Sequence, residues 1–303
     1  MGVINTGSFA AGLIPGLKGW FGIGYNEHSP EFSDTFKKDT SDKAYVEIPG
    51  FSGLGLATEK SQGGSISFDS FRQYLTNRFT NVTYGLGFII TREMVEDSQY
   101  AEIGKQRSRS LAFSMRQTKE NVGAAILNRG WDTGYLGADG VELFSIAHLT
   151  DGSTFANELA TAADLSSASL EQACIDIMGF VNARGLKINV MPRKLVVPKE
   201  LVFDSERILK SSLEYDTANN AINALKSTGM FPEGIKVNHY LSDTDAFFIV
   251  TNAPDGPTYF ERRAVEFAPA ENDFDTENAK FKATERYVFG VPDVRGIFGS
   301  PGA

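Results

Sequence analysis

The longest periodic stretch of the chain runs over residues 91–130 without a proline. Its apolar residues recur at spacings that place them on one helix face; they are Ile103, Leu111, Met115, Val122 and Ile126. Thr91 can cap the start, and Gly130 favours an end there. We predict one helix over 91–130, roughly 58 Å long at 1.5 Å per residue. A break near Gly104 is left open, because glycine weakens a helix.

Residues 44–85 show the imperfect alternation typical of a twisted pair of strands. Two extended arms flank a polar tip, TEKSQGG, so the stretch predicts one very long β-hairpin. An arm of ~18 residues spans roughly 60 Å, and a two-stranded ribbon is marginal alone in water. No other part of the chain is an evident partner, so we expect the hairpin to pack on other copies of the chain.

A second helical pattern runs from Ser166 to Arg184, with Ser166 as N-cap and Gly185 as the expected end. Its apolar stripe includes Cys174, which favours a buried core thiol over a nucleophile. After it, Pro198 suits the first turn of a helix.

Three later segments have the composition of strands: IKVNHYL, AFFIVT and KFKATERYVFG. In the third, apolar and polar residues alternate, and Glu285 is the one polar residue on the apolar side.

The first 40 residues combine frequent glycines with large apolar side chains. This composition is too glycine-rich for a confident long helix and too apolar for a disordered tail. Such an arm usually lies across another surface. Phe9, Trp20 and Phe21 are therefore candidates for contact with another copy, and packing on the arm's own domain is the alternative.

Composition narrows the chemistry. The chain has 303 residues, one cysteine and three histidines, so an intrachain disulfide and a multi-cysteine metal site are excluded. The histidines are scattered, and a hydrolase or nucleotide-binding enzyme that uses His148 or His239 is a remote alternative. The acidic run Asp273, Asp275 and Glu277 lacks the glycine and distant glutamate of a calcium loop, so we expect a solvated loop. We expect no catalytic residue, cofactor or metal.

The formal net charge of −9 disfavours sequence-specific DNA binding. Cations nevertheless gather in the central helix, where they form either a solvated face or a locally basic surface that tolerates a nearby polyanion. The sequence lacks a signal peptide and a membrane-length apolar run, so we expect a soluble protein made in the cytoplasm, with no membrane partner.

Several segments together resemble the major capsid proteins of tailed bacteriophages, specifically the Mu-like head-protein group. They span nearly the whole chain: MGVINTGSFA, YGLGFIITREM, LAFSMRQTKE, LEQACIDIMGF, RGLKINVMPRKLVVPKEL with ERILKS, VNHYL, DAFFIVT and NDFDTENAKFKATERYVFGVPDVRGIFGSPGA. Their order and spacing carry the resemblance more than any single motif does.

The resemblance implies an α+β protein with the Hong Kong 97 capsid fold. That fold has an N-terminal arm, an extended hairpin loop, a peripheral domain with a spine helix and sheet, and an axial domain. We assign these parts, in order, to residues 1–43, 44–90, 91–185 (spine 91–130) and 186–275, with a C-terminal strand returning to the peripheral domain at 276–303.

The resemblance also implies the function of a major capsid protein, whose pentamers and hexamers form an icosahedral virion shell around double-stranded DNA. An encapsulin-like compartment is the alternative. The expected partners are a portal, a decoration protein and a separate scaffolding protein, with assembly in the bacterial cytoplasm. A separate scaffolding protein is expected because the chain lacks a long charged N-terminal helix. The expected inward basic face is Arg107, Arg109, Arg116 and Lys119. The expected inter-subunit hairpin tip is Glu59, Lys60 and Gln62, and covalent crosslinking through Lys60 is not favoured.

Overall fold

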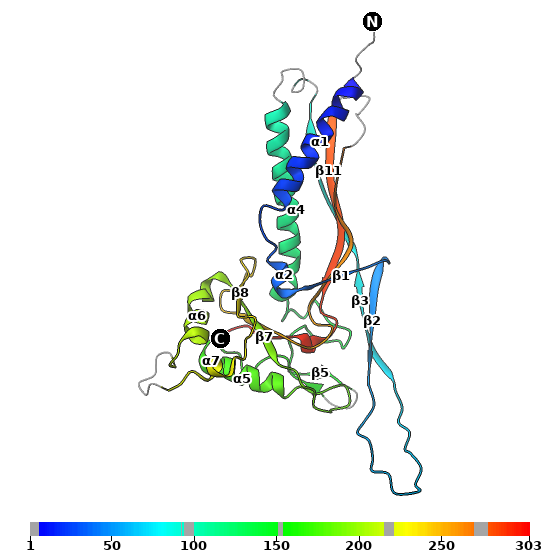
Figure 1. The fold of residues 1–303 in the computed structure, drawn as a ribbon, viewed down its shortest axis with the longest axis vertical. Helices are drawn as coiled ribbons and strands as arrows, with labels where there is room; N and C mark the ends of the chain where they lie inside the picture. The colour runs from blue at the N-terminus through cyan, green and yellow to red at the C-terminus, as the bar shows by residue number, and fades with distance from the viewer. Residues whose placement is uncertain (1–5, 92, 94–99, 151–153, 215–220, 270–277) are drawn as a thin grey trace.

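A computed structural model describes residues 6–91, 93, 100–150, 154–214, 221–269 and 278–303. The chain forms an elongated lobe and a globular lobe, and a long loop extends beside the globular lobe (Figure 1). This mixture of helices and strands confirms the predicted α+β class.

The elongated lobe is a four-stranded sheet with helices on one face (Figure 1). Its order is β1-β10-β11-β4, with β1 parallel to β10 and the other pairs antiparallel. The strands are β1 Lys37–Thr40, β10 Thr258–Pro269, β11 Ala279–Gly290 and β4 Val82–Ile90, and the helices are α1 Thr6–Tyr25, α2 Phe32–Thr35 and α4 Tyr100–Asn128. Alternate residues of β11 are buried under the helices, which confirms the predicted strand.

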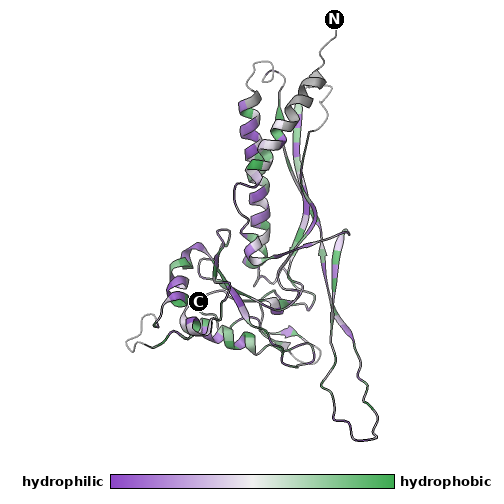
Figure 2. Ribbon diagram, in the orientation of Figure 1, coloured by the Kyte–Doolittle hydropathy of each residue, from purple (hydrophilic) through white to green (hydrophobic). Residues whose placement is uncertain are grey.

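The predicted spine helix is present as α4, and it runs without a break through Gly104. The suggested break does not occur at Gly104 itself, and α4 is described only from Tyr100 onward. A side chain at Gly104 would come within 3.0 Å of Leu17, so the glycine lets α1 approach closely. Polar and apolar residues alternate around α4 (Figure 2), as an amphipathic helix requires. Residues 92 and 94–99, which include most of the expected first turns, lie outside the described residues.

The N-terminal arm forms a helix of 20 residues, α1, which the glycine content did not predict. The reason is tertiary packing. A side chain at Gly24 would lie 3.3 Å from both the Ala112 side chain and the Arg109 backbone of α4. Contact with α4 therefore outweighs the weak helix propensity of glycine in this segment.

The globular lobe contains a second four-stranded sheet, in the order β12-β9-β7-β8. Its strands are β7 Pro192–Val197, β8 Ile235–Val237, β9 Phe247–Thr251 and β12 Ile297–Ser300. Around it lie α5 Ser167–Met178, η1 Lys199–Leu201, α6 Val202–Lys210, α7 Ala224–Thr228, η2 Val294–Gly296, and the short pair β5 His148–Leu149 and β6 Thr154–Phe155. The predicted strands in IKVNHYL and AFFIVT are confirmed as β8 and β9.

Helix α5 begins as predicted. The Ser166 side chain accepts from the Ser169 amide, and the Ser169 side chain accepts from the Ser166 amide, a reciprocal cap. The helix ends at Gly179 rather than at Gly185, which has a φ of +77° in the following turn. Cys174 is buried in the core, as predicted.

The predicted domain boundaries differ from the observed lobes. Helix α5 packs in the core of the globular lobe, outside the peripheral part assigned to it. Strand β10 belongs to the elongated sheet, although 186–275 was assigned to the axial domain. Strand β12 pairs with β9 in the globular lobe and does not return with β11. Strand partners distant in sequence decide lobe membership, so neither lobe is one contiguous range, and the assignment of capsid domains to ranges stays a prediction.

The predicted hairpin is real but shorter. Strands β2 Tyr45–Phe51 and β3 Gln73–Thr80 pair with each other, and the intervening residues 52–72 contain no strand. The next strand, β4, pairs along its length with β11. The expectation that 82–85 continue the hairpin and lack a partner in the chain is therefore wrong.

Candidate assembly site

The extended loop exposes apolar side chains. Phe68 is 96 % exposed and Leu56 80 %, and Leu54, Ile66 and Phe71 are also exposed. A surface that gathers so many uncovered apolar groups marks an interaction site. Glu59, Lys60 and Gln62 are exposed in the same loop, as predicted for its tip, and their contacts with another subunit remain a prediction.

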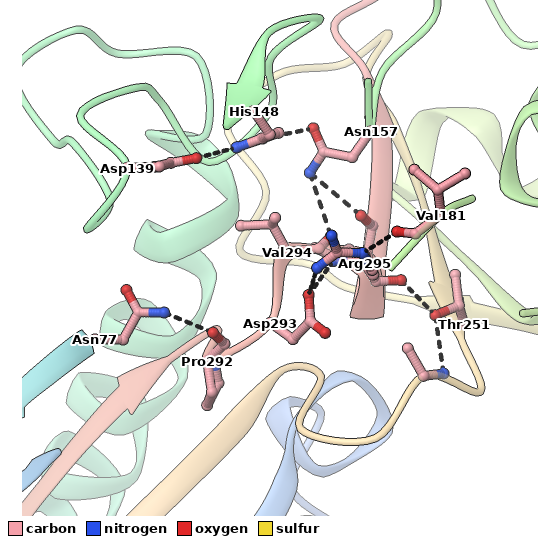
Figure 3. A network of polar contacts seen from close by, with 12 residues as sticks. Asn77, Asp139, His148, Asn157, Val181, Thr251, Pro292, Asp293, Val294 and Arg295 are labelled. Carbon is pink, nitrogen blue, oxygen red and sulfur yellow. Dashed lines mark hydrogen bonds and ion pairs between the residues drawn. The ribbon is translucent and has the colours of Figure 1, made fainter. Parts of the chain in front are cut away.

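The base of this loop is fixed to the rest of the chain. The Phe51 and Phe71 rings stack with centroids 5.0 Å apart, where the β2–β3 pairing ends. The Asn77 amide donates to the Pro292 carbonyl at 2.6 Å (Figure 3). The Phe79 ring stacks on Phe260 of β10 at 5.8 Å. The loop is therefore held at its root and leaves its apolar distal part uncovered.

A polar hub lies next to this root, where β11 leads into β12 (Figure 3). Arg295 donates from Nε to the Val181 carbonyl at 2.7 Å and from Nη1 to Asp293 at 3.2 Å. Its own carbonyl accepts from the Thr251 hydroxyl at 2.7 Å. The guanidinium also lies over the Phe155 ring, 4.4 Å from the centroid. Arg295 thus joins the turn after α5, strand β9 and the segment that follows β11.

His148 is part of the same hub and has no free nitrogen for catalysis. Its Nδ1 lies 2.6 Å from Asp139 Oδ2, and its Nε2 faces Asn157 Oδ1 at 3.0 Å and the Leu143 carbonyl at 3.2 Å. Because Asn157 Oδ1 also accepts the Ser145 amide, it is the amide oxygen, and Nε2 donates to it. The geometry is structural and opposes a hydrolase built on His148.

The other histidine of that alternative, His239, is exposed and pairs with Glu31 at 2.8 Å. Within the described ranges, no three histidine, cysteine or acidic side chains come together in a way that could hold a metal ion. The acidic run 273–277 lies outside the described residues.

The predicted basic face of the spine helix is not one surface. Lys119 is only 3 % exposed and points into the elongated lobe, and Arg116 is largely buried against Glu120. Arg107 is exposed and donates to the Ile89 carbonyl, and Arg109 is exposed near Glu27. Including Lys119 was wrong, because its helix position faces the sheet and not solvent.

Lys119 belongs to a buried ionic cluster that joins three elements. Its Nζ lies 2.5 Å from Glu285 of β11 and donates to the Tyr25 hydroxyl of α1 at 2.7 Å. The Tyr25 hydroxyl donates to Glu285 at 3.2 Å. Burial raises the pKa of Glu285, which the ammonium of Lys119 opposes. Glu285 on the apolar side of its strand was the sequence signal for this cluster.

The aromatic residues predicted for inter-subunit contact lie within their own chain where the structure describes them. Phe21 is buried, and its ring lies 5.1 Å from that of Phe267. Trp20 packs on the cluster of Leu17, Ile90 and Phe281. The alternative of an arm packed on its own domain therefore holds for Trp20 and Phe21. The side chain of Phe9 lies outside the described residues.

The sequence model of the phage capsid protein family matches residues 76–299 of this chain. The chain belongs to the phage capsid protein family. It is therefore a structural protein of a virion capsid, as the resemblance implied, and capsid subunits of this kind assemble into a shell. In a comparison with curated proteins, none matches.

Solved structures share the fold at low sequence identity. A virus-like particle from Pyrococcus furiosus matches with a TM-score of 0.52 at 10 % identity, covering 94 % of this chain and 97 % of that one. Mycobacterium phage Che8 gives 0.52 at 16 %, covering 90 % and 92 %. A phage-related protein from Bordetella bronchiseptica RB50 gives 0.52 at 13 %, covering 92 % and 95 %. The Hong Kong 97-type capsid fold is thereby confirmed.

Among the described residues, no helix has both the length and the apolar character needed to cross a bilayer.

Proposed function

We propose that this capsid protein is the major subunit of an icosahedral tailed-phage head, with pentamers and hexamers that enclose packaged double-stranded DNA. The observation that carries the proposal is the extended loop, which leaves Phe68 and Leu56 almost fully exposed within one chain. Family membership supplies the context in which a second subunit covers such a surface.

The proposed mechanism is packing rather than catalysis. Each loop lies on a neighbouring subunit and buries its apolar residues there, so every subunit both gives and receives a loop. Apolar burial contributes about 25 cal/mol per Å². Repeating the same contact around a closed shell adds multivalent stability to that of each single contact.

Several partners belong to this proposal. A separate scaffolding protein would template the shell, a portal would occupy one vertex, and a decoration protein would bind the outside. Assembly would take place in the host cytoplasm. The exposed Arg107 and Arg109 of the spine helix are the remaining candidates for nonspecific contact with DNA phosphates.

The test is electron microscopy and light scattering of the purified protein. The protein is produced alone and also together with the products of the adjacent phage genes. Closed shells or ring-shaped capsomers support the proposal. A monomer that forms neither, under all these conditions, overturns it. Analysis of the particle contents separates the two shell functions, since nucleic acid indicates a phage head and a specific protein cargo indicates an encapsulin-like compartment.

A further inference from the structure

Just beyond its root, the return arm of the extended loop contacts the globular lobe of its own chain through Arg184. Arg184 Nη1 lies 3.2 Å from Asp69 Oδ1 and 3.0 Å from Asp69 Oδ2, and Nη2 lies 3.2 Å from Oδ1. The same Nη2 donates to the Ser70 carbonyl. This fork of donors on one carboxylate and one carbonyl fixes direction as well as distance.

Asp69 also joins the two arms of the loop. Its Oδ2 accepts the backbone N–H of Gly55 at 2.8 Å, and Gly55 lies on the opposite arm. A side chain at Gly55 would come within 3.2 Å of Asp69 Oδ2 and 3.6 Å of Arg184 Nη1. The Gly55 and Ser70 amides, with Arg184, hold the pKa of Asp69 below its usual range. A single carboxylate therefore connects the outgoing arm, the return arm and the globular lobe.

Arg184 itself is held firmly on the side of the lobe. It lies in the turn after α5, where Asn182 Oδ1 accepts the amides of Arg184 and Leu186, both at 2.9 Å. The preceding Val181 carbonyl accepts from Arg295 of the polar hub at 2.7 Å (Figure 3). The contact between Arg184 and Asp69 thus positions the loop relative to the polar hub.

Beyond its root the loop has little regular structure of its own. Strand pairing of its two arms ends at Phe51 and Gln73 in the described chain. Beyond that point the arms meet at separate contacts, such as the Thr58 and Ser67 hydroxyls, 2.7 Å apart. With so few contacts between its two arms, the orientation of the loop depends on its contacts with the rest of the chain.

We propose that Asp69 and Arg184 form a releasable latch, which holds the loop against its own globular lobe when closed and lets it swing toward a neighbouring subunit when open. The second half of this statement rests on the proposed shell function. The latch is releasable because Asp69 keeps 42 % and Arg184 21 % of its side-chain surface in solvent. Water and salt therefore compete with the pair.

The test measures the position of the loop in the full-length subunit. Gln62→Cys in the loop and Lys199→Cys on the globular lobe carry nitroxide labels, and the distances between them are measured by pulsed electron spin resonance. Cys174 does not take up label, because it is buried and burial raises its thiol pKa to about 12. Dilution with unlabelled protein suppresses signals between subunits.

We expect one dominant distance in the parent protein at low salt. Arg184→Gln and Asp69→Asn should each raise the population at other distances by about fivefold, the effect typical of an exposed ion pair with good geometry. Sodium chloride at about 1 M should do the same to the parent protein.

Lys210→Gln is the matched control. It removes a cation of the same lobe that pairs with Glu206 on its own helix, and it should leave the distances unchanged. The proposal is overturned if Arg184→Gln leaves the distribution as in the parent. The salt series on the parent protein decides the matter if a variant does not fold, since an unchanged distribution in high salt also overturns the latch. Particle formation is scored separately, so a failure of the shell function is distinguishable from a failure of the latch.

Discussion

Lys119 Nζ and Glu285 Oε2 lie 2.5 Å apart in the interior of the elongated lobe, and both side chains are almost completely buried. The pair joins the spine helix to the strand beneath it, and the Tyr25 hydroxyl links both groups to α1. Such a pair costs desolvation energy, which the mutual attraction and the hydrogen bonds offset. The pair contributes to the stability of the fold only when both partners are present.

Removing one partner should therefore be far more damaging than removing both. Lys119→Met leaves the Glu285 carboxylate buried without its counter-ion, and we expect the free energy of unfolding to fall by about 3–5 kcal/mol. The double variant Lys119→Met with Glu285→Leu should recover most of this loss. Urea unfolding of the dissociated subunits measures both. Equal destabilisation by the single and double variants would contradict the explanation.

The buried carboxylates should also make stability depend on pH. Burial is the largest cause that raises the pKa values of Glu285 and Glu120 above the usual range. Between the ordinary carboxyl pKa and these raised values, the folded state binds more protons than the unfolded state. The free energy of unfolding should fall as pH rises through this interval.

Glu285→Gln tests the sign of this pH dependence. The glutamine side chain is uncharged at every pH and has nearly the same shape as glutamate. Its free energy of unfolding, measured by urea titration from about pH 4 to pH 8, should vary less with pH than that of the parent. A steeper dependence in the variant would show that Glu285 has the opposite effect.

The thiol of Cys174 should be inert in the folded protein. Burial raises its pKa to about 12, and the side chain lies in the core of the globular lobe. Because the thiolate is the reactive species, a chromogenic disulfide reagent at pH 8 should react at the rate of unfolding. Stopped-flow absorbance with and without urea measures this rate. Fast reaction without denaturant would indicate that the thiol is accessible.

The exposed apolar residues of the loop should matter for assembly and not for folding. Phe68→Asp places a charge where the proposed function requires burial, so it should abolish particles in electron micrographs. Its effect on subunit stability should stay within about 0.5 kcal/mol. Gln62→Asp adds the same charge at an exposed polar position of the same loop, so it should impair assembly less than Phe68→Asp does. Normal shells from Phe68→Asp would remove the loop from the assembly mechanism.

Local signals in the sequence predicted individual elements well. The cap at Ser166 and the periodicity of the spine helix depend on neighbours within a few residues, so both are visible without the fold. Glu285 was also visible, as a polar residue on an apolar strand face, but its partner Lys119 was assigned to the surface. Helical spacing alone did not show which side of α4 the sheet covers.

The features that the sequence did not predict depend on residues far apart in the chain. Strand β4 has its partner in β11, and Asp69 has its partner in Arg184. Nothing near β4 or Asp69 identifies these partners. The N-terminal helix was missed for a related reason, because contact with α4 decides its conformation more than its own glycines do.

The division of the strands between two sheets has a mechanical consequence. The chain passes between the lobes after α4, between β9 and β10, and between β11 and β12. Any change of angle between the lobes must therefore bend three backbone segments together, and no single hinge residue can absorb it. Subunits that adopt different curvatures at different lattice positions would do so by small concerted shear across all three passages, with Arg295 beside the last of them.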